Sequence, residues 1–188
     1  MVRLFVAIDL ADASRERLKT ICHGLPGARW VKDEQLHLTL RFIGEVDEPL
    51  FQDIREVLGG VEAQAFSLQL DGIGCFPPRG RPRIVWAGVA ANRELLHLQK
   101  KIESVLTREA GLDPEGRKYA PHITLARLKN TPPERVGRYL EEYGLFFCPP
   151  FAVDCFSLYS SFLGKNGASH VLEESYPLSG GGKNVDGR

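Results

Sequence analysis

A tetrapeptide that occurs twice constrains this chain more than any other feature: HLTL at residues 37–40 and HITL at residues 122–125. Each copy lies in a run of residues typical of a β-strand. Because successive side chains of a strand point to opposite faces, the His and the Thr of each copy share one face. The chain must therefore fold so that two strands bury Leu or Ile on one side and present a polar pair on the other.

The remaining pattern predicts helices and strands in mixed order. Strands are predicted over residues 4–10, 28–31, 36–43, 66–70, 84–89, 122–128, 151–159 and 170–178. Helices are predicted from a cap at Asp12 or Ser14 to Pro26, from Pro49 to Gly59, from Asn92 to Gly111 and from Pro132 to Tyr143. Because several strands follow one another directly, the pattern favours an α+β fold with mainly antiparallel sheets. One domain is expected over residues 1–178, followed by a disordered Gly-rich tail at residues 179–188.

Charge narrows the classes of partner. Lys plus Arg and Asp plus Glu each total 24, so the chain has no net charge with which to attract duplex nucleic acid without regard to sequence. Any contact with a nucleic acid must come from local clustering. The densest positive cluster is the Pro-rich loop from Phe76 to Arg83, which contains Arg79 and Arg81. This loop is either an exposed turn or a clamp for an RNA backbone.

Apolar runs and cysteines indicate the compartment. The sequence has no run of about 18 apolar residues, which argues against a membrane span or a signal peptide and for a cytoplasmic protein. The four cysteines have no Cys-x-x-Cys spacing. Four buried, reduced thiols are therefore expected rather than a zinc site.

The two polar pairs, His37 with Thr39 and His122 with Thr124, suit a phosphate group. A Thr hydroxyl can donate to a nonbridging oxygen, and His, with an unperturbed pKa of about 6.5, can give or take a proton near neutrality. Two facing pairs would hold a phosphate between an acid and a base, as hydrolysis of a cyclic phosphodiester requires. A strand His can instead be a structural residue, but two copies that agree at both polar positions make that the weaker interpretation.

The other histidines, His23, His97 and His170, are assigned to structure. The sequence has no His-Glu-x-x-His motif or comparable cluster of metal ligands. Neither a metal nor another cofactor is therefore expected.

Four further residues each have two interpretations. Arg127 stands at an odd offset from His122, so a regular strand would turn it away from the site, whereas a bulge or twist would bring it to a phosphate. Phe42, Trp86 and Tyr119 are either core residues or, beside a cleft, platforms on which an RNA base can stack.

With these motifs the chain resembles the two-histidine phosphoesterase superfamily, whose signature is His-x-Thr-x occurring twice. It is most similar to the RNA 2′,3′-cyclic phosphodiesterase branch, also called 2′-5′ RNA ligase. Further resemblance lies in residues 3–10, 41–46, 81–88 and 121–127, and the likeness covers residues 1–178.

The resemblance implies a bilobal fold in which two lobes, related by a pseudo-twofold, each place one motif on a central cleft. It implies hydrolysis of RNA 2′,3′-cyclic phosphate ends to 2′-phosphates without a metal, and weak joining of tRNA halves through a 2′-5′ bond. It also implies that His37 is the proton donor and His122 the proton acceptor, while Thr39, Thr124 and Arg127 bind phosphate. A monomer is expected. The alternative is a non-catalytic module that binds RNA ends or nucleotides, which two histidines suited to proton exchange disfavour.

Overall fold

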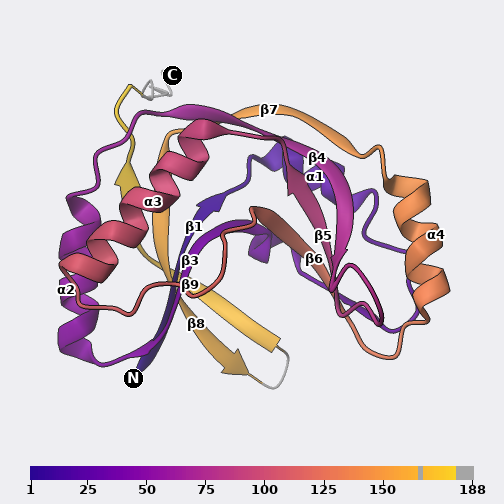
Figure 1. Ribbon diagram of the computed structural model, residues 1–188, viewed down its shortest axis with the longest axis horizontal. Helices are drawn as coiled ribbons and strands as arrows, with labels where there is room; N and C mark the ends of the chain where they lie inside the picture. Colours follow the sequence, from indigo (N-terminus) through magenta and orange to yellow (C-terminus); the bar gives the residue numbers. More distant parts are fainter. Residues whose placement is uncertain (165–166, 181–188) are drawn as a thin grey trace, which may run out of the picture.

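Two antiparallel sheets stand side by side in the computed structural model, which describes residues 1–164 and 167–180 (Figure 1). The first sheet has the order β3-β1-β8-β9, with strands β1 (Val2–Asp9), β3 (His37–Val46), β8 (Cys155–Gly164) and β9 (Gly167–Pro177). The second has the order β2-β6-β5-β4-β7, with strands β2 (Ala28–Trp30), β4 (Phe66–Phe76), β5 (Ile84–Val89), β6 (His122–Leu128) and β7 (Phe147–Val153). The predicted α+β class with mainly antiparallel sheets is confirmed.

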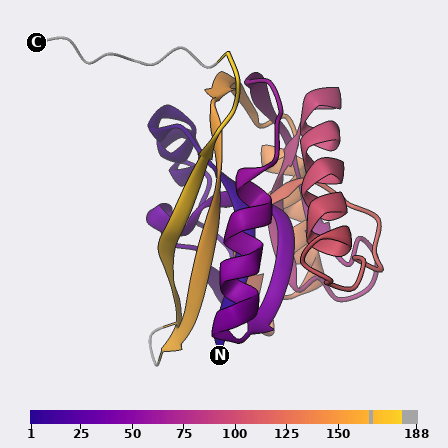
Figure 2. The same ribbon diagram turned by 90° about the vertical axis from the view of Figure 1, so that its left-hand side faces the viewer.

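In the part of the chain that the structure describes, four helices pack against the two sheets. The helices are α1 (Asp12–Lys19), α2 (Glu48–Gly59), α3 (Arg93–Arg108) and α4 (Pro133–Tyr143). Helices α2 and α3 contact each other and lie against β9 and β3 of the first sheet, and α3 also contacts β4 of the second, whereas α1 and α4 lie against β7 and β4 (Figures 1 and 2). Helix α3 begins at the predicted cap, where the Asn92 side chain accepts a hydrogen bond from the Leu95 amide. The molecule is therefore two-lobed.

The first helix is shorter than predicted. It begins after Ala11, which makes no side-chain cap, and ends at Lys19 instead of continuing toward Pro26. Ile21 and Leu25 are nevertheless buried. Their spacing reflects burial of an irregular segment after the helix, which the helical pattern alone could not distinguish from a further turn of helix.

The predicted strand over residues 151–159 is wrong, because it spans two strands that belong to different sheets. Strand β7 ends at Val153 and β8 begins at Cys155, so the chain changes sheets around Asp154. Strand β7 contains Pro149 and Pro150 and lies at the edge of its sheet, where a missing N–H does not break the sheet.

Strand β4 continues past the predicted end at Leu70 to Phe76. Its pairing with β5 shifts register between Leu70 and Ile73, and Gly72 within this irregularity has φ +75°. Gly is suited to that conformation, so Gly72 marks a bulge within a long strand.

Ser179, the first residue of the predicted tail, is hydrogen-bonded to the fold. The Ser179 amide donates to the Ala63 carbonyl, and its own carbonyl accepts from the Ala65 amide. The prediction of disorder otherwise falls on residues 181–188, which lie outside the described residues. The domain boundary at residue 178 stays a prediction.

The cysteines differ partly from expectation. All four are free, but only Cys75 and Cys148 are buried, whereas Cys22 and Cys155 are half-buried. Among the described helices, none has the length and apolar character needed to cross a membrane.

Candidate active site

The two motif strands, β3 and β6, contact each other where the two sheets meet. The apolar residues of each motif are buried, with Leu38 and Ile123 fully inaccessible to solvent. The polar faces line one cleft of about 600 Å³, which contains His37, Thr39, His122 and Thr124. The alternation predicted from the tetrapeptides thus brings both polar pairs into a single site.

A β-bulge follows the Thr in each motif strand. Opposite β1, the register of β3 skips Leu40, and opposite β5, the register of β6 skips Leu125. The extra residue reverses which face the following side chains occupy. Phe42 and Arg127 consequently both line the cleft, each five positions after the His of its motif. The odd offset of Arg127 from His122 left two alternatives open, a regular strand or a bulge. The structure has the bulge, which turns Arg127 toward the cleft.

Each His is held by the backbone in the same manner. The distance from His37 Nδ1 to the Gln35 carbonyl oxygen is 2.7 Å, and that from His122 Nδ1 to the Ala120 carbonyl oxygen is also 2.7 Å. A carbonyl oxygen can only accept, so Nδ1 carries the hydrogen in both rings. Nε2 is then the nitrogen available to give or take a proton.

The rings that surround the two histidines differ. His37 stacks on Phe5 with ring centroids 4.8 Å apart, and the His170 ring lies edge-on to it at 5.3 Å. His122 instead meets the Phe76 ring edge-on at 5.0 Å and a tilted Trp86 at 6.3 Å. One half of the site therefore contains a second imidazole and the other an indole.

Burial, and to a smaller extent the nearby His170, lower the pKa of His37 to about 4. The Gln35 carbonyl and the Asp9 carboxylate act in the opposite direction without compensating. Without a bound anion, His37 is therefore neutral at pH 7, with a lone pair on Nε2. Burial likewise lowers the pKa of His170.

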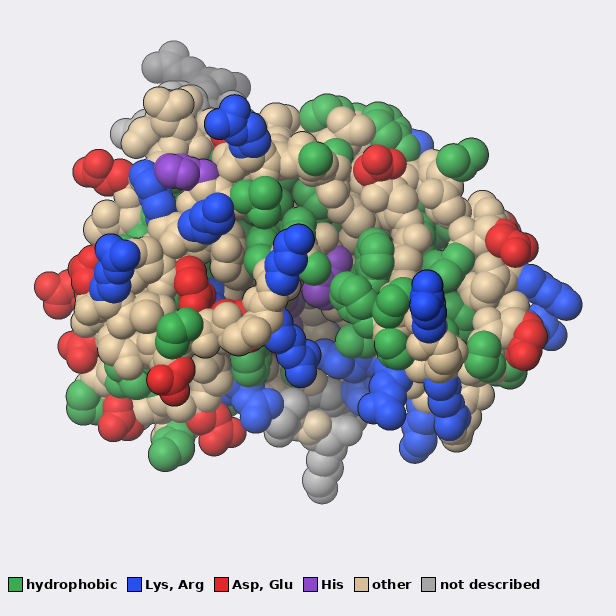
Figure 3. Space-filling view, viewed as in Figure 1, with side chains coloured by type: hydrophobic (Ala, Val, Ile, Leu, Met, Phe, Trp, Pro, Cys, Tyr) green, Lys and Arg blue, Asp and Glu red, His purple; other side chains and the backbone are tan. Residues whose placement is uncertain are grey.

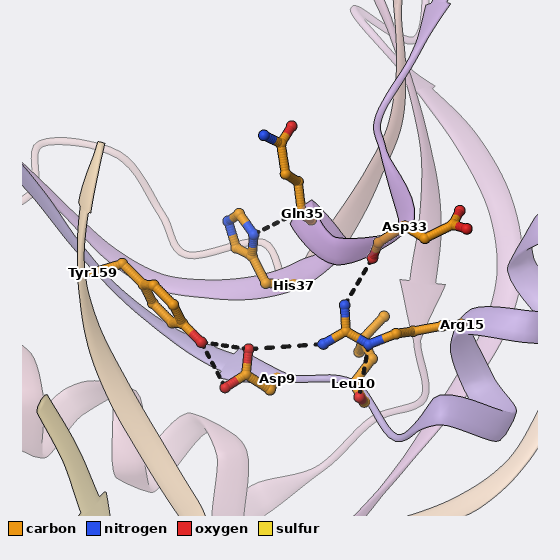
Figure 4. A network of polar contacts seen from close by, with 7 residues as sticks. All are labelled: Asp9, Leu10, Arg15, Asp33, Gln35, His37 and Tyr159. Atoms are coloured by element: carbon orange, nitrogen blue, oxygen red, sulfur yellow. Dashed lines mark hydrogen bonds and ion pairs between the residues drawn. The ribbon is translucent and has the colours of Figure 1, made fainter. Parts of the chain in front are cut away.

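A polar network behind His37 fixes the segment that holds it (Figure 4). Arg15 donates to the Asp33 carbonyl at 2.7 Å, at the start of the 3₁₀ turn Asp33–Gln35. Arg15 also lies 3.9 Å from Asp9, whose two carboxylate oxygens accept from the Tyr159 hydroxyl at 2.7 and 2.8 Å. This network sets the position of the Gln35 carbonyl and hence the orientation of the His37 ring.

Cationic side chains predominate around the cleft. Among the described residues, its lining contains four cations and no carboxylate; the cations are Arg3, Arg29, Lys32 and Arg127. Figure 3 shows His side chains in a central hollow with Lys and Arg around it. Arg3 is partly neutralised by Glu45, at 3.3 Å. The cleft thus favours an anionic ligand although the whole chain is neutral.

Two of the predicted aromatic contacts lie outside the cleft lining. The Trp86 indole covers Gly74, where a Cβ would lie only 2.2 Å from the ring, and supports His122 from behind. The Tyr119 hydroxyl donates to the Thr39 carbonyl at 3.1 Å and so links the loop before β6 to β3. Both residues support the site, and their contact with RNA stays a prediction.

The loop arginines also lie outside the lining. Arg79 is exposed, and Arg81 donates to the Asn130 side chain at 2.7 Å. Their contact with RNA stays a prediction.

A family model described as LigT like Phosphoesterase matches residues 8–86 and 88–169, and each matched segment contains one His-x-Thr-x motif. The chain belongs to the LigT-like phosphoesterase family.

Members of this family with similar sequences carry one common name. A relative from Aeropyrum pernix is 44% identical over 112 residues, which span 58% of this chain and 62% of the relative, and it is named RNA 2′,3′-cyclic phosphodiesterase. A relative of the same name from Thermotoga maritima is 33% identical over 96% of this chain and 97% of its own. The crystal structure of TT0787 from Thermus thermophilus superposes with a TM-score of 0.80 at 28% identity, covering 96% of this chain and 100% of that one.

Sequence reasoning missed several residues of this LigT-like cleft. His170 was assigned to structure, yet it lines the cleft beside His37. Gln35 and Phe5 hold the His37 ring, and Lys32 adds charge. The short spacing between Gln35 and His37 was the one local signal, since a carbonyl two residues before a strand His can reach its Nδ1.

The described residues contain no group of three or more His, Cys, Asp or Glu side chains placed to hold a metal ion.

Proposed function

We propose that this protein hydrolyses the 2′,3′-cyclic phosphate end of RNA to a 2′-phosphomonoester. The observation that carries the proposal is that His37 and His122, each with Nδ1 bound to a carbonyl, line one cationic cleft together with Thr39 and Thr124. Such an arrangement offers two proton-transfer groups and two hydroxyl donors to one phosphate. The name shared by the relatives from A. pernix and T. maritima supports the choice of substrate.

In the proposed reaction, a water molecule attacks phosphorus opposite the ribose 3′ oxygen. His122 accepts the proton that the water loses, and His37 donates the proton that the departing 3′ oxygen gains. The new P–O bond to water replaces the P–O3′ bond, which leaves a 2′-phosphate and a 3′-hydroxyl. These two roles are those implied by the family resemblance.

The remaining polar groups of the cleft would bind the phosphate itself. The Thr39 and Thr124 hydroxyls donate to its nonbridging oxygens, and Arg127 stabilises the charge that develops on them. This assignment needs Arg127 on the cleft side of β6, which the bulge after Thr124 provides.

His37 must gain a proton before it can act as the donor. Without a bound anion its pKa is lowered to about 4. A bound phosphate anion would raise it, because a nearby negative charge favours the imidazolium form. Binding of the substrate therefore leads to protonation of His37, whereas in the substrate-free protein Nε2 of His37 carries no proton near pH 7.

The RNA chain would extend from the cleft over basic and aromatic side chains. Phe42 is 52% exposed and lines the cleft, so a base can stack on it. Arg79 and Arg81 would contact the backbone farther along the chain. Weak 2′-5′ joining of tRNA halves, a monomeric state and a cytoplasmic location belong to the same proposal.

A second candidate is a module that binds RNA ends without turnover. The low pKa of His37 favours it, since a neutral imidazole has no proton to donate from Nε2 and can serve there as a hydrogen-bond acceptor. Under this alternative the cations and Thr hydroxyls alone explain the cleft.

The test is incubation of the protein with a nucleoside 2′,3′-cyclic monophosphate in excess EDTA, followed by identification of the product. We expect a 2′-phosphomonoester at an undiminished rate. Loss of activity on chelation with recovery on adding a divalent ion would reject the metal-independent mechanism. Binding of the nucleotide without any product would favour the second candidate.

A further inference from the structure

His170 lies in the cleft without a polar partner. It belongs to β9, opposite Ser161 of β8, in the hairpin that these two strands form (Figure 1), and it lines the cleft. Within the described residues, its ring nitrogens make no hydrogen bond or ion pair, and its ring contacts are aromatic. His170 is only partly buried, so water can reach its nitrogens, and no described protein group fixes its tautomer or its charge.

His170 packs against His37, the proposed proton donor. Its edge lies against His37, with centroids 5.3 Å apart and an interplanar angle of 71°. It also meets Phe5 at 4.8 Å and 68°, while Phe5 itself stacks on His37. Together, Phe5 and His170 restrict the plane of the His37 imidazole.

A second connection joins the same strand to His37. The Gln35 carbonyl accepts from His37 Nδ1, while the Gln35 side-chain amide donates to the Ala168 carbonyl at 2.5 Å. Ala168 precedes His170 by two residues and also lines the cleft. Strand β9 therefore contacts His37 in two ways. The His170 ring packs against it, and Ala168 holds Gln35, whose carbonyl fixes the His37 tautomer.

Protonating both imidazoles at this distance is unfavourable, because the two positive charges repel each other. The other charged groups acting on His37 are Asp9 of β1, which favours its protonation, and Arg15 of α1, which opposes it. Asp9 is itself engaged by Tyr159 of β8. Burial lowers the pKa of both imidazoles, and a positive charge on His170 further disfavours a proton on His37.

We propose that His170 is a positioning residue of this site: its ring holds the His37 imidazole in its reactive orientation and, while neutral, leaves the incoming proton to His37. The inference rests on the proposed hydrolysis for its catalytic meaning, but the pairing of the two rings does not. Protonation of His170 lowers the pKa of His37 and so leaves His37 without the proton that it must donate.

The test compares His170→Ala, which removes the ring, with His170→Phe, which keeps a flat ring without charge. The matched control is His97→Ala, since His97 is an exposed His on α3 outside this cleft. On a 2′,3′-cyclic mononucleotide, His170→Ala should lower kcat about tenfold with little change in KM, because orientation rather than binding is lost. His170→Phe should recover most of kcat but move the acidic limb of the pH profile.

An NMR titration of the substrate-free protein separates this inference from the proposed function. In His170→Phe the pKa of His37 should rise by about half a unit, because the like charge is removed while the ring stays covered. An unchanged His37 titration, or an effect confined to KM for an oligonucleotide, would overturn the inference and make His170 a substrate contact. If no variant and no wild-type protein turned over, the proposed hydrolysis would fail while the titration still decided the pairing.

Discussion

The two halves of the cleft have one backbone plan and different side chains. In both halves a carbonyl two residues before the His accepts from Nδ1, a Thr follows two positions later, and a bulge then turns a further side chain into the cleft. That side chain is Phe42 in one half and Arg127 in the other. The two halves therefore share one backbone geometry although the side chains that they place in the cleft differ.

The different side chains suit the two halves of the cleft to different parts of a nucleotide. In the His37 half, the rings of Phe5, His170 and Phe42 line the cleft, which suits a nucleoside and an imidazole that is neutral until an anion binds. The rings beside His122, those of Phe76 and Trp86, lie outside the cleft lining. The His122 half places Arg127 next to Thr124 and suits the phosphate oxygens. Equivalent substitutions in the two halves should therefore have unequal effects on kcat and KM.

The largest effect should come from the histidines themselves. Replacing either His37 or His122 by Ala should lower kcat by about 10² to 10⁴, the usual contribution of a general acid or base. The double variant should lose far less than the product of the single losses, because groups that act together are not additive. Circular dichroism should show that each variant is folded; losses that multiplied would mean that the two halves act independently.

The equivalent positions Phe42 and Arg127 should separate binding from chemistry. Arg127→Ala should lower kcat by about 10 to 10², since the stabilised charge is greatest in the transition state. Phe42→Ala should mainly raise KM for a nucleotide or RNA, because stacking acts on the bound base. Arg108→Ala, an exposed arginine of α3, is the matched control; identical kcat and KM patterns for the two cleft variants would break the comparison.

Phosphate binding should protonate His37. Its pKa is about 4 in the substrate-free protein, so its imidazole is neutral at pH 7. Inorganic phosphate in the cleft should raise this pKa by about one unit or more, and phosphate affinity should accordingly weaken as the pH rises. An NMR titration of His37 with and without phosphate measures the change, and a midpoint that phosphate did not move would leave the donor role without a source of protons.

The smallest effect is expected from the loop outside the cleft. Replacing Arg79 and Arg81 together by Ala should raise KM for an oligonucleotide a few-fold and flatten its salt dependence, while a cyclic mononucleotide is unaffected. The double variant Arg135→Ala with Arg138→Ala, on exposed positions of α4, controls for lost charge. Equal losses on both substrates would instead place the loop arginines in the catalytic site.

The local parts of this site could be predicted from the sequence, and the long-range parts could not. Alternation in the two tetrapeptides predicted which side chains share a face, because that depends only on neighbouring residues. The bulges after Thr39 and Thr124 depend on the register with β1 and β5, so the position of Arg127 stayed open. His170 is brought to His37 by the pairing of β9 with β8, far along the chain, and nothing local distinguished it from the structural His97.

The fold follows the same rule. The cap at Asn92 and the helix after it were predictable, since both are local. The change of sheet around Asp154 was not, because one alternating pattern runs through β7 and β8 although the two strands pair with different partners.

The pH dependence of kcat shows whether His37 and His122 exchange protons on one phosphate. We expect a bell-shaped profile for hydrolysis of a 2′,3′-cyclic nucleotide, with limbs that belong to the coupled pair. His37→Ala should remove the limb of the acid and His122→Ala that of the base. A folded His122→Ala variant with near-normal turnover and an unaltered profile would contradict the two-histidine mechanism.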